Sequence, residues 1–292
     1  MKTLLLTGAN GFLGQEIQTC LKDEFQIITL GRSPESTVIC DLAKQVPAIP
    51  LAIDIVVHCA GKAHIVPRSS SEKEDFFKVN TAGTQHLLKG LEQLPRLPEQ
   101  IIFISTVAVY GLDSGELITE EAPLLGESPY AKSKIAAEKE LLDWGHRHQV
   151  SVLILRPPLI VGKNAPGNLA ALRNAIQKGY YVRIACNEAR KSVVLASDIA
   201  QLIPKVRGKS GVYNLSDGVH PKFSAIEDQV AKELKKPIRW SIPLWVLKTA
   251  ARLGGFLPGF PLNTARLDKM TNSLTFSDAL ARKELGWQPK GV

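Results

Sequence analysis

Apolar residues follow two alternating patterns along the first half of the chain. Short runs rich in β-branched residues predict buried strands at residues 3–7, 25–30, 37–39, 53–59, 100–105 and 150–155. Between them, segments with helical periodicity predict helices at 11–22, 72–94 and 129–147. Because continuously apolar strands that alternate with helices form parallel sheets covered on both faces, we expect an α/β fold.

The regular alternation ends after Arg156-Pro157-Pro158, where proline and glycine begin to separate shorter elements. We therefore predict a main domain formed by residues 1–160, with 192–217 returning to it. The remaining residues, 161–191 and 218–292, are expected to form a smaller C-terminal lobe that binds the substrate. Within the returning part, residues 192–203 and 211–215 are expected to rejoin the sheet.

Charge and hydropathy argue against two classes of partner. The chain has 292 residues, is 45% hydrophobic and has a net charge of +8. Its basic residues are scattered and lack interleaved aromatic residues, so we expect no nucleic-acid partner. The apolar run 243–261 is interrupted by Lys248, Arg252 and three glycines, which argues against a membrane span. The amphipathic segment 244–253 is expected to pack the lobe or line its cleft, and no membrane partner is predicted.

The cysteines carry information about the compartment. Cys20, Cys40, Cys59 and Cys186 have no metal-ligand spacing and lie in apolar contexts. We expect buried free thiols, no metal site and a cytoplasmic protein. The apolar run at the start of the chain breaks at once into Thr7-Gly8, so no signal peptide is expected.

A glycine-rich turn follows the first predicted strand. The sequence TGANGFLG places Gly8, Gly11 and Gly14 between that strand and the first helix. In this setting glycines let backbone N–H groups approach a pyrophosphate at the positive end of the helix. We therefore predict a Rossmann-type, doubly wound sheet that binds a dinucleotide, with further contacts from the intervening residues Asn10, Phe12 and Leu13.

The end of the second strand bears on which dinucleotide binds. NAD usually meets a carboxylate there, whereas this chain has Gly31-Arg32-Ser33. Arg32 is suited to a 2′-phosphate, with Ser33 as a further donor, so NADP is favoured and NAD is the alternative. Further cofactor contacts are predicted for residues after the third strand, after the fourth strand and after the sixth strand. These residues are Asp41, Leu42, Cys59, Ala60, Gly61 and Pro157.

Three further side chains predict a catalytic group. Tyr130 and Lys134 are four residues apart, so on a helix they share one face. Lys134 is expected to lower the pKa of Tyr130 and make it a better proton donor and acceptor. Thr106 follows a buried strand, from which its hydroxyl could hydrogen-bond a substrate carbonyl or hydroxyl.

The motifs TGANGFLG, STVAVYG and YAKSK, in this order, resemble the extended short-chain dehydrogenase/reductase family, in the branch that acts on nucleotide-linked sugars. The resemblance covers almost the whole chain. It implies that Thr106, Tyr130 and Lys134 are catalytic, and that hydride passes between a nicotinamide and a sugar carbon. Asn80 matches the family's helix asparagine and is included among the cofactor-site residues as structural support. Family enzymes often dimerise through the helices that carry Asn80 and Tyr130, so a homodimer is compatible with the sequence.

The residues after Thr106 narrow the reaction. Family members that dehydrate sugars tend to carry an Asp-Glu pair there, whereas this chain has Val107-Ala108, which cannot transfer protons. A 4-keto-sugar reductase is favoured through the NADP interpretation of Arg32. A UDP-hexose 4-epimerase with tightly bound NAD is the alternative within enzymes. A non-catalytic dinucleotide-sensing protein is the alternative from another class.

The C-terminal lobe resembles bacterial enzymes that reduce UDP-4-keto-6-deoxy-hexosamines. The resemblance lies in four short sequences, RPPLIVG (156–162), GN (167–168), KS (191–192) and NSL (272–274). The implied partner is a nucleotide-diphospho-sugar, with UDP favoured. By family position Lys191 takes the place of an arginine at the diphosphate, with Arg190 beside it. Asn168 is expected near the nucleotide or its phosphates, and His64 could face the substrate.

Overall fold

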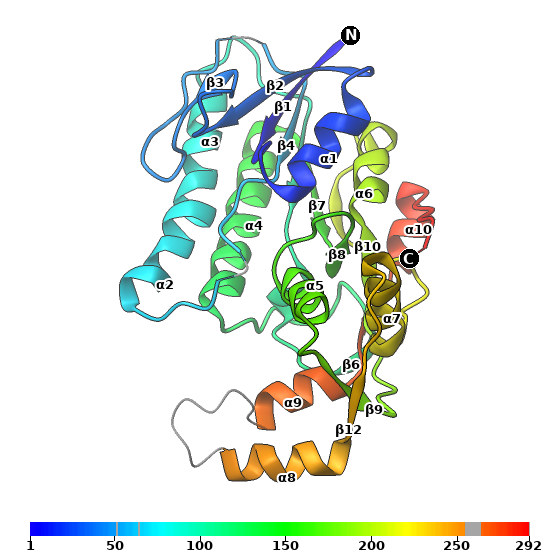
Figure 1. Cartoon of the computed structure of the whole chain (residues 1–292). Helices are drawn as coiled ribbons and strands as arrows, with labels where there is room; N and C mark the ends of the chain where they lie inside the picture. The colour runs from blue at the N-terminus through cyan, green and yellow to red at the C-terminus, as the bar shows by residue number, and fades with distance from the viewer. Residues whose placement is uncertain (51, 64, 255–263, 292) are drawn as a thin grey trace.

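The computed structural model describes residues 1–50, 52–63, 65–254 and 264–291. Its centre is a seven-stranded parallel sheet in the order β11-β7-β5-β4-β1-β2-β3. The strands are β1 (Lys2–Thr7), β2 (Phe25–Gly31), β3 (Val38–Ile39), β4 (Ile55–His58), β5 (Gln100–Ile104), β7 (Ser151–Arg156) and β11 (Gly211–Asn214). The chain starts in the middle of the sheet and builds outward in both directions, so the order reverses between β1 and β4 (Figure 1). The predicted doubly wound α/β fold is confirmed, and all six predicted strands join this sheet.

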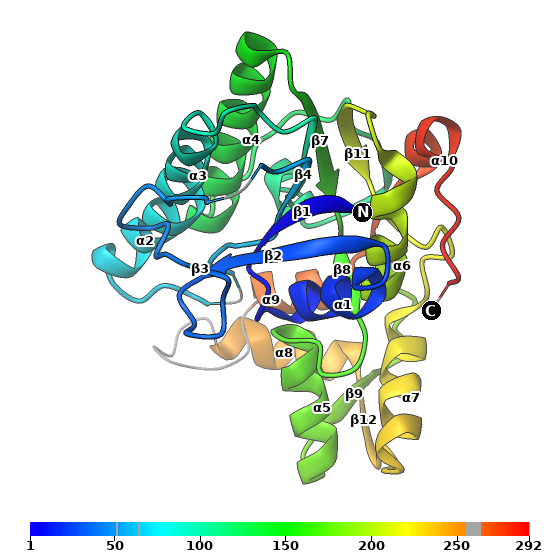
Figure 2. The same cartoon turned by 90° about the horizontal axis from the view of Figure 1, so that it is seen from above.

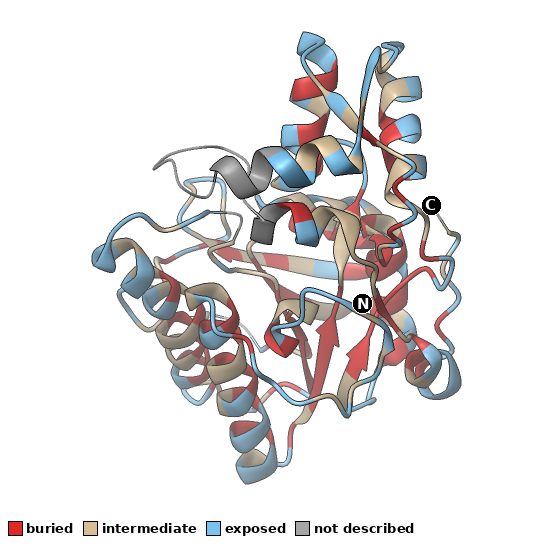
Figure 3. Ribbon diagram, turned by 90° about the horizontal axis from the view of Figure 1, so that it is seen from below, coloured by how far each residue is buried: buried red, intermediate tan, exposed pale blue. Residues whose placement is uncertain are grey.

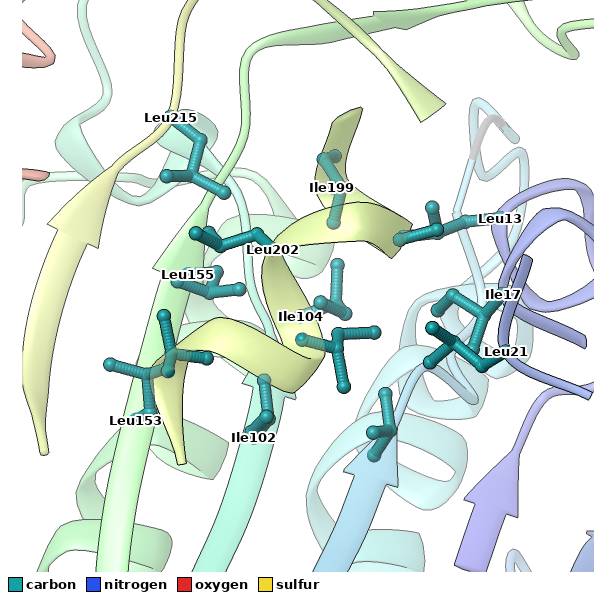
Figure 4. Packing of buried hydrophobic residues seen from close by; sticks show 14 of the residues in the cluster. Leu13, Ile17, Leu21, Ile102, Ile104, Leu153, Leu155, Ile199, Leu202 and Leu215 are labelled. Carbon is teal, nitrogen blue, oxygen red and sulfur yellow. The ribbon is translucent and has the colours of Figure 1, made fainter. Parts of the chain in front are cut away.

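Helices cover both faces of the sheet (Figure 2). One face packs against α1 (Phe12–Leu21) and α6 (Ala196–Leu202). Figure 4 shows leucine and isoleucine side chains of α1 and α6 meeting those of β5 and β7. The other face packs against α3 (Gly83–Leu91) and α4 (Pro129–His148). Since adjacent residues of a strand face opposite sides, one strand supplies both cores.

The predicted helix 72–94 is divided into three parts. α2 (Ser70–Phe76) is followed by a π-helical segment, η1 (Phe77–Ala82), and then by α3. The N–H of Gly83 donates to the carbonyl of Lys78, five residues earlier, and this spacing marks the wide turn. Periodicity alone does not predict it, because one wide turn keeps the apolar residues close to their helical positions.

The C-terminal part consists of short elements attached to the carboxyl ends of the main strands. Three two-stranded parallel sheets pair β8 (Leu159–Val161) with β10 (Val193–Leu195), β9 (Val182–Ala185) with β12 (Trp240–Pro243), and β6 (Gly115–Ile118) with β13 (Leu274–Phe276). The described helices are α5 (Asn168–Lys178), α7 (Phe223–Leu234), α8 (Leu244–Gly254), α9 (Thr264–Thr271) and α10 (Ala279–Leu285). The division into two domains stays a prediction.

Two expectations need correction. Residues 211–215 rejoin the main sheet as β11, but residues 192–203 do not rejoin it as a strand. Instead, β10 pairs with β8 outside the main sheet and α6 packs on the face of the main sheet. The cysteines are also less buried than expected, since Cys40 is buried, Cys20 and Cys59 are partly exposed, and Cys186 is exposed. No helix in the described ranges is both long and apolar enough to cross a bilayer.

Candidate active site

A cleft of about 800 Å³ opens at the carboxyl ends of the main strands. Ligands of open α/β sheets bind at this edge, next to the point where the strand order reverses. The cleft brings together eleven of the predicted residues from five separate segments of the chain. They are Gly8, Gly11, Phe12, Leu13, Gly14, Cys59, Gly61, Thr106, Tyr130, Lys134 and Pro157.

The glycine turn packs too tightly for side chains. Gly8 has φ +70°, and a Cβ there would lie 2.7 Å from the amide nitrogen of Ala60. A Cβ on Gly14 would lie 2.2 Å from the carbonyl oxygen of Gly8. Gly11 is the N-cap of α1 and forms no side-chain cap, so the first amides of the helix are open to the cleft. These unpaired donors fit the pyrophosphate of a dinucleotide.

A buried chain of hydrogen bonds fixes the loop after β4, opposite the glycine turn. The hydroxyl of Thr84 donates to the carbonyl of Asn80 at 2.7 Å, so it accepts from Nε2 of His58 at 3.0 Å. Nδ1 of His58 then accepts from Thr7 at 2.6 Å, and Thr7 accepts from the N–H of Ala60 at 3.1 Å. Burial lowers the pKa of His58 to about 3, which keeps the ring neutral as this chain requires. His58 is therefore a structural residue behind the cleft.

Asn80 connects the loop after β4 to α4 and does not line the cleft. Its Oδ1 accepts from the N–H of Lys62 at 2.7 Å, and its Nδ2 donates to Oγ of Ser133 at 2.9 Å. Asn80 is 2% exposed and lies within the π-helical segment. It connects the loop after β4 to α4, the helix that carries Tyr130 and Lys134, which fits the structural role implied by the family resemblance.

The two hydroxyls that end β5 have different surroundings. Ser105 is buried and donates to the carboxylate of Glu138, away from the cleft. Thr106 lines the cleft and caps a 3₁₀ turn, η2 (Val107–Tyr110), by accepting from the N–H of Ala108 at 3.1 Å. Accepting that bond leaves the hydroxyl of Thr106 able to donate, and it forms a hydrogen bond with Tyr130 in the same cleft. Thr106 is therefore the hydroxyl placed for chemistry, and Ser105 is an anchor.

Glu138 lies at the centre of a buried polar network. This network was not predicted from the sequence. Both of its oxygens accept from Arg156, at 3.1 Å from Nε and 2.6 Å from a terminal nitrogen. Arg156 also donates to the hydroxyl of Tyr110 at 3.0 Å, and Tyr110 donates to Oδ1 of Asn214 at 2.8 Å. The signal available in the sequence was the spacing, because Glu138 lies four residues after Lys134 on one helical face.

Tyr130 and Lys134 both line the cleft, but they do not interact as predicted. Burial raises the pKa of Tyr130, and a hydrogen bond with Thr106 opposes this effect without reversing it. Nζ of Lys134 instead donates to the carbonyl of Ile104 at 2.6 Å and lies 4.1 Å from the centre of the Phe103 ring. Burial lowers the pKa of Lys134 to about 8. The expected lowering of the Tyr130 pKa by Lys134 is thus absent, since the ammonium group is directed toward β5.

The other predicted cofactor residues lie outside the lining of the cleft. Arg32 is exposed at the end of β2 and forms no ion pair within the described ranges, and Ser33 follows it in the turn. Asp41 accepts from the N–H of Ala43 at 3.1 Å, so its carboxylate stabilises its own turn. Leu42 is buried, and its carbonyl accepts from His86 at 2.7 Å. The backbone of Ala60 packs against Gly8 of the glycine turn. Asn10 lies within that turn, and its carbonyl accepts a hydrogen bond from the side chain of Gln15.

The predicted substrate residues of the lobe are not brought to the cleft. Nζ of Lys191 donates to the carbonyls of Lys269 and Asn272, both at 2.8 Å, at the end of α9. Arg190 donates to the carbonyl of His220 at 3.1 Å. Asn168 is the first residue of α5 and is absent from the lining, while His64 falls outside the described residues.

Three residues of the loop between β8 and α5 line the cleft instead. Lys163, Asn164 and Pro166 follow Gly162, whose φ of +156° and close approach to Phe12 carry the loop over the start of α1. Lys163 is exposed and is the residue of this loop that could meet an anionic group in the cleft. Sequence reasoning passed over it, because a lysine in a loop carries no pattern of its own.

Comparisons with known proteins agree with this arrangement. The model of the NAD dependent epimerase/dehydratase family matches residues 4–215. The chain is 28% identical to UDP-glucose 4-epimerase of Vibrio cholerae, over 99% of this chain and 91% of that protein. It is 31% identical to GDP-6-deoxy-D-mannose reductase of Pseudomonas aeruginosa, over 78% of this chain and 79% of that protein. The structure of RMD from Pseudomonas aeruginosa complexed with NADPH shares the fold, with TM-score 0.74 and 23% identity over 99% of this chain and 94% of that chain.

Proposed function

The chain belongs to the NAD dependent epimerase/dehydratase family, and we propose that it is an NADPH-dependent reductase of a nucleotide-diphospho-4-keto sugar, with UDP as the favoured nucleotide. The observation that carries the proposal is the convergence of Thr106, Tyr130 and Lys134 on one cleft beside the glycine turn. A proton donor, a hydrogen-bond donor and a cation at the edge of a dinucleotide-binding sheet are the groups that carbonyl reduction needs.

The proposed roles follow from the contacts of each side chain. A bound nicotinamide dinucleotide would supply the hydride. Thr106 would donate a hydrogen bond to the carbonyl oxygen, keeping its own proton, and stabilise the negative charge that develops there. Tyr130 would then give its phenolic proton to the same oxygen, completing the alcohol. The raised pKa of Tyr130 keeps it protonated before the reaction, which suits a donor. Lys134 would hold the ribose, with its ammonium group kept in place by the carbonyl of Ile104.

Dehydration of the sugar is disfavoured by the residues around Thr106. Loss of water needs an acid and a base next to the reacting carbons, in addition to the hydride carrier. Val107 and Ala108 occupy the following turn and neither can transfer a proton. The carboxylate of the nearest buried acid on α4, Glu138, is held by Arg156 and Ser105.

The choice of a reductase over an epimerase rests on the cofactor. A reductase exchanges its cofactor in every turnover and usually draws on NADPH. Arg32 is exposed and without an ion pair in the described part of the chain, so it is available for a 2′-phosphate. The relative that is a GDP-6-deoxy-D-mannose reductase, and the NADPH in a solved structure of similar fold, support this choice.

A UDP-hexose 4-epimerase with tightly bound NAD is the second candidate. The observation that favours it is the similarity to UDP-glucose 4-epimerase, which extends over nearly the whole length of both proteins. A dinucleotide-sensing protein without catalysis is a third candidate, and the intact set of Thr106, Tyr130 and Lys134 speaks against it.

The cofactor separates these candidates. The protein would be purified, denatured and assayed for released NAD and NADP, and then titrated with NADPH and NADH. An empty site with a strong NADPH preference supports the reductase, and turnover of UDP-4-keto-6-deoxy sugars would follow from it. Retained NAD with interconversion of UDP-hexoses would replace the reductase by the epimerase. NADPH binding without turnover of any nucleotide sugar would favour the sensing protein.

A further inference from the structure

The segment β12–α8 is packed against the lobe but keeps several exposed side chains. Ile184 of β9 is 3% exposed and packs with Leu244 and Leu247 of α8 against Leu267 of α9. On the opposite face of the same small sheet, Arg183 pairs with Glu227 and Asp228 of α7. These contacts hold the helix and the two strands in place without using the exposed side chains of the segment.

Large aromatic side chains of this segment are nevertheless exposed. Trp240 is 65% exposed and Trp245 is 71% exposed, whereas Trp144 and Trp287 are buried. At most about 17 Å of extended chain separates the two exposed tryptophans. Val182, which pairs with Trp240, and the nearby Tyr180 are also exposed. Exposed tryptophan on a structured element is characteristic of surfaces that meet a partner.

The charge of this segment is entirely of one sign. From residue 234 to residue 267 the sequence contains no acidic residue, and its basic residues are Lys235, Lys236, Arg239, Lys248, Arg252 and Arg266. Six positive charges thus fall in one stretch of a chain whose net charge is +8. Lys235, Lys236, Arg239 and Lys248 are exposed and form no ion pair with any described residue. Basic residues are scattered over the rest of the chain, and this stretch is the exception.

We propose that the β12–α8 surface docks the protein on the face of an anionic lipid bilayer. Tryptophan prefers the headgroup region, where its ring is buried and its N–H is hydrated, and basic side chains beside it are attracted by anionic lipids. Trp245 and Lys248 are three residues apart, so they share the outer face of α8. A second copy of the chain fits less well, because two such surfaces would bring like charges together. This proposal replaces the expectation that no membrane is involved, and it is independent of the proposed reaction.

The test is vesicle co-sedimentation of the full-length protein. Vesicles of phosphatidylcholine with phosphatidylglycerol would be compared with vesicles of phosphatidylcholine alone. We expect binding to the anionic vesicles, with a blue shift of tryptophan emission that disappears in the variant Trp240→Phe/Trp245→Phe. The variant Lys235→Gln/Lys236→Gln/Arg239→Gln should bind about 100-fold more weakly, at about fivefold for each charge.

A matched variant controls for net charge. Lys22→Gln/Lys139→Gln/Lys209→Gln removes the same number of exposed positive charges from other parts of the molecule and should bind like the wild type. Equal losses in the two triple variants would overturn the proposal, since any positive charge would then serve. Three other results would overturn it too. The wild type could fail to bind anionic vesicles, or it could bind single-stranded DNA more tightly than vesicles. It could also sediment as a dimer that the tryptophan substitutions dissociate.

Discussion

Replacing Glu138 by leucine should destabilise the protein strongly, because it leaves a buried guanidinium without its counter-ion. The side chains of Arg156 and Glu138 are 5% and 3% exposed, and they share two hydrogen bonds. After the substitution, the remaining acceptor for Arg156 within the network is the hydroxyl of Tyr110. Removing one partner of a buried ion pair typically costs about 3–5 kcal/mol of unfolding free energy. We expect a loss in that range for Glu138→Leu.

Removing both charges should be far less damaging. In Glu138→Leu/Arg156→Met neither member of the ion pair is left without its partner, and apolar side chains of similar size often replace a buried ion pair at little cost. The hydroxyls of Ser105 and Tyr110 then lose a partner each, so a residual loss of about 1–3 kcal/mol is expected. The double variant should therefore be more stable than Glu138→Leu, although it carries more substitutions.

Urea unfolding followed by circular dichroism measures both effects, provided that the slope with urea stays constant among the variants. Glu74→Leu is the control, because Glu74 and Lys78 form an exposed pair at 3.9 Å whose loss should cost at most about 1 kcal/mol. The reasoning fails if Glu138→Leu loses no more than this control. It fails equally if the double variant is as unstable as the single one, since the cost would then come from packing.

Three further predictions concern the site. Tyr130→Phe should lower kcat at least about 100-fold while the Kd for NADPH changes by less than about twofold, and turnover close to wild type would refute the proton-donor role. Burial lowers the pKa of Lys134 from the usual lysine value of 10.5 to about 8 in the folded protein. Between these two pH values the unfolded chain binds more protons than the folded one, so the contribution of Lys134 to stability should rise with pH. Urea titrations at several pH values should show the stability of the wild type relative to Lys134→Met rising by about 3 kcal/mol in total, a difference that removes the opposite contribution of the Cys59 thiol, whose pKa is raised. Gly8→Ala should cost more stability than Gly179→Ala, because both have positive φ but a Cβ meets the backbone of Ala60 only at Gly8; equal losses would show that the close approach is unimportant.

The sheet could be predicted because its strands are buried on both faces. Leu4, Leu5 and Leu6 are each 0% exposed, and such continuous apolar runs stand out against helical periodicity. The small sheets of the C-terminal part offer no comparable signal. β6 has its two central residues exposed, and β8 has three residues of which one is buried. Their pairing depends on contacts between distant parts of the chain, which a local pattern does not record.

The candidate site divides in the same way. Gly8, Thr106, Tyr130 and Lys134 could be placed together because each belongs to a local motif with its own geometry. Lys191 is different, because the direction of its side chain depends on the carbonyls that end α9, nearly eighty residues later in the sequence. The direction of the Lys134 ammonium group was beyond prediction for a similar reason, since it depends on how closely α4 packs on β5.

The end of β5 shows how one short stretch serves stability and chemistry together. Successive side chains of an extended strand point to opposite sides, so Ser105 and Thr106 necessarily face different surroundings. Ser105 enters the network of Glu138 and Arg156, and that network also holds the end of β7 through Arg156. Thr106 is thereby presented to the cleft from a strand whose position is set by buried hydrogen bonds. Val107 and Ala108, which carry no proton-transferring side chains, then form the turn that Thr106 caps, so the hydroxyl is kept in place by a turn that adds no ionisable group of its own.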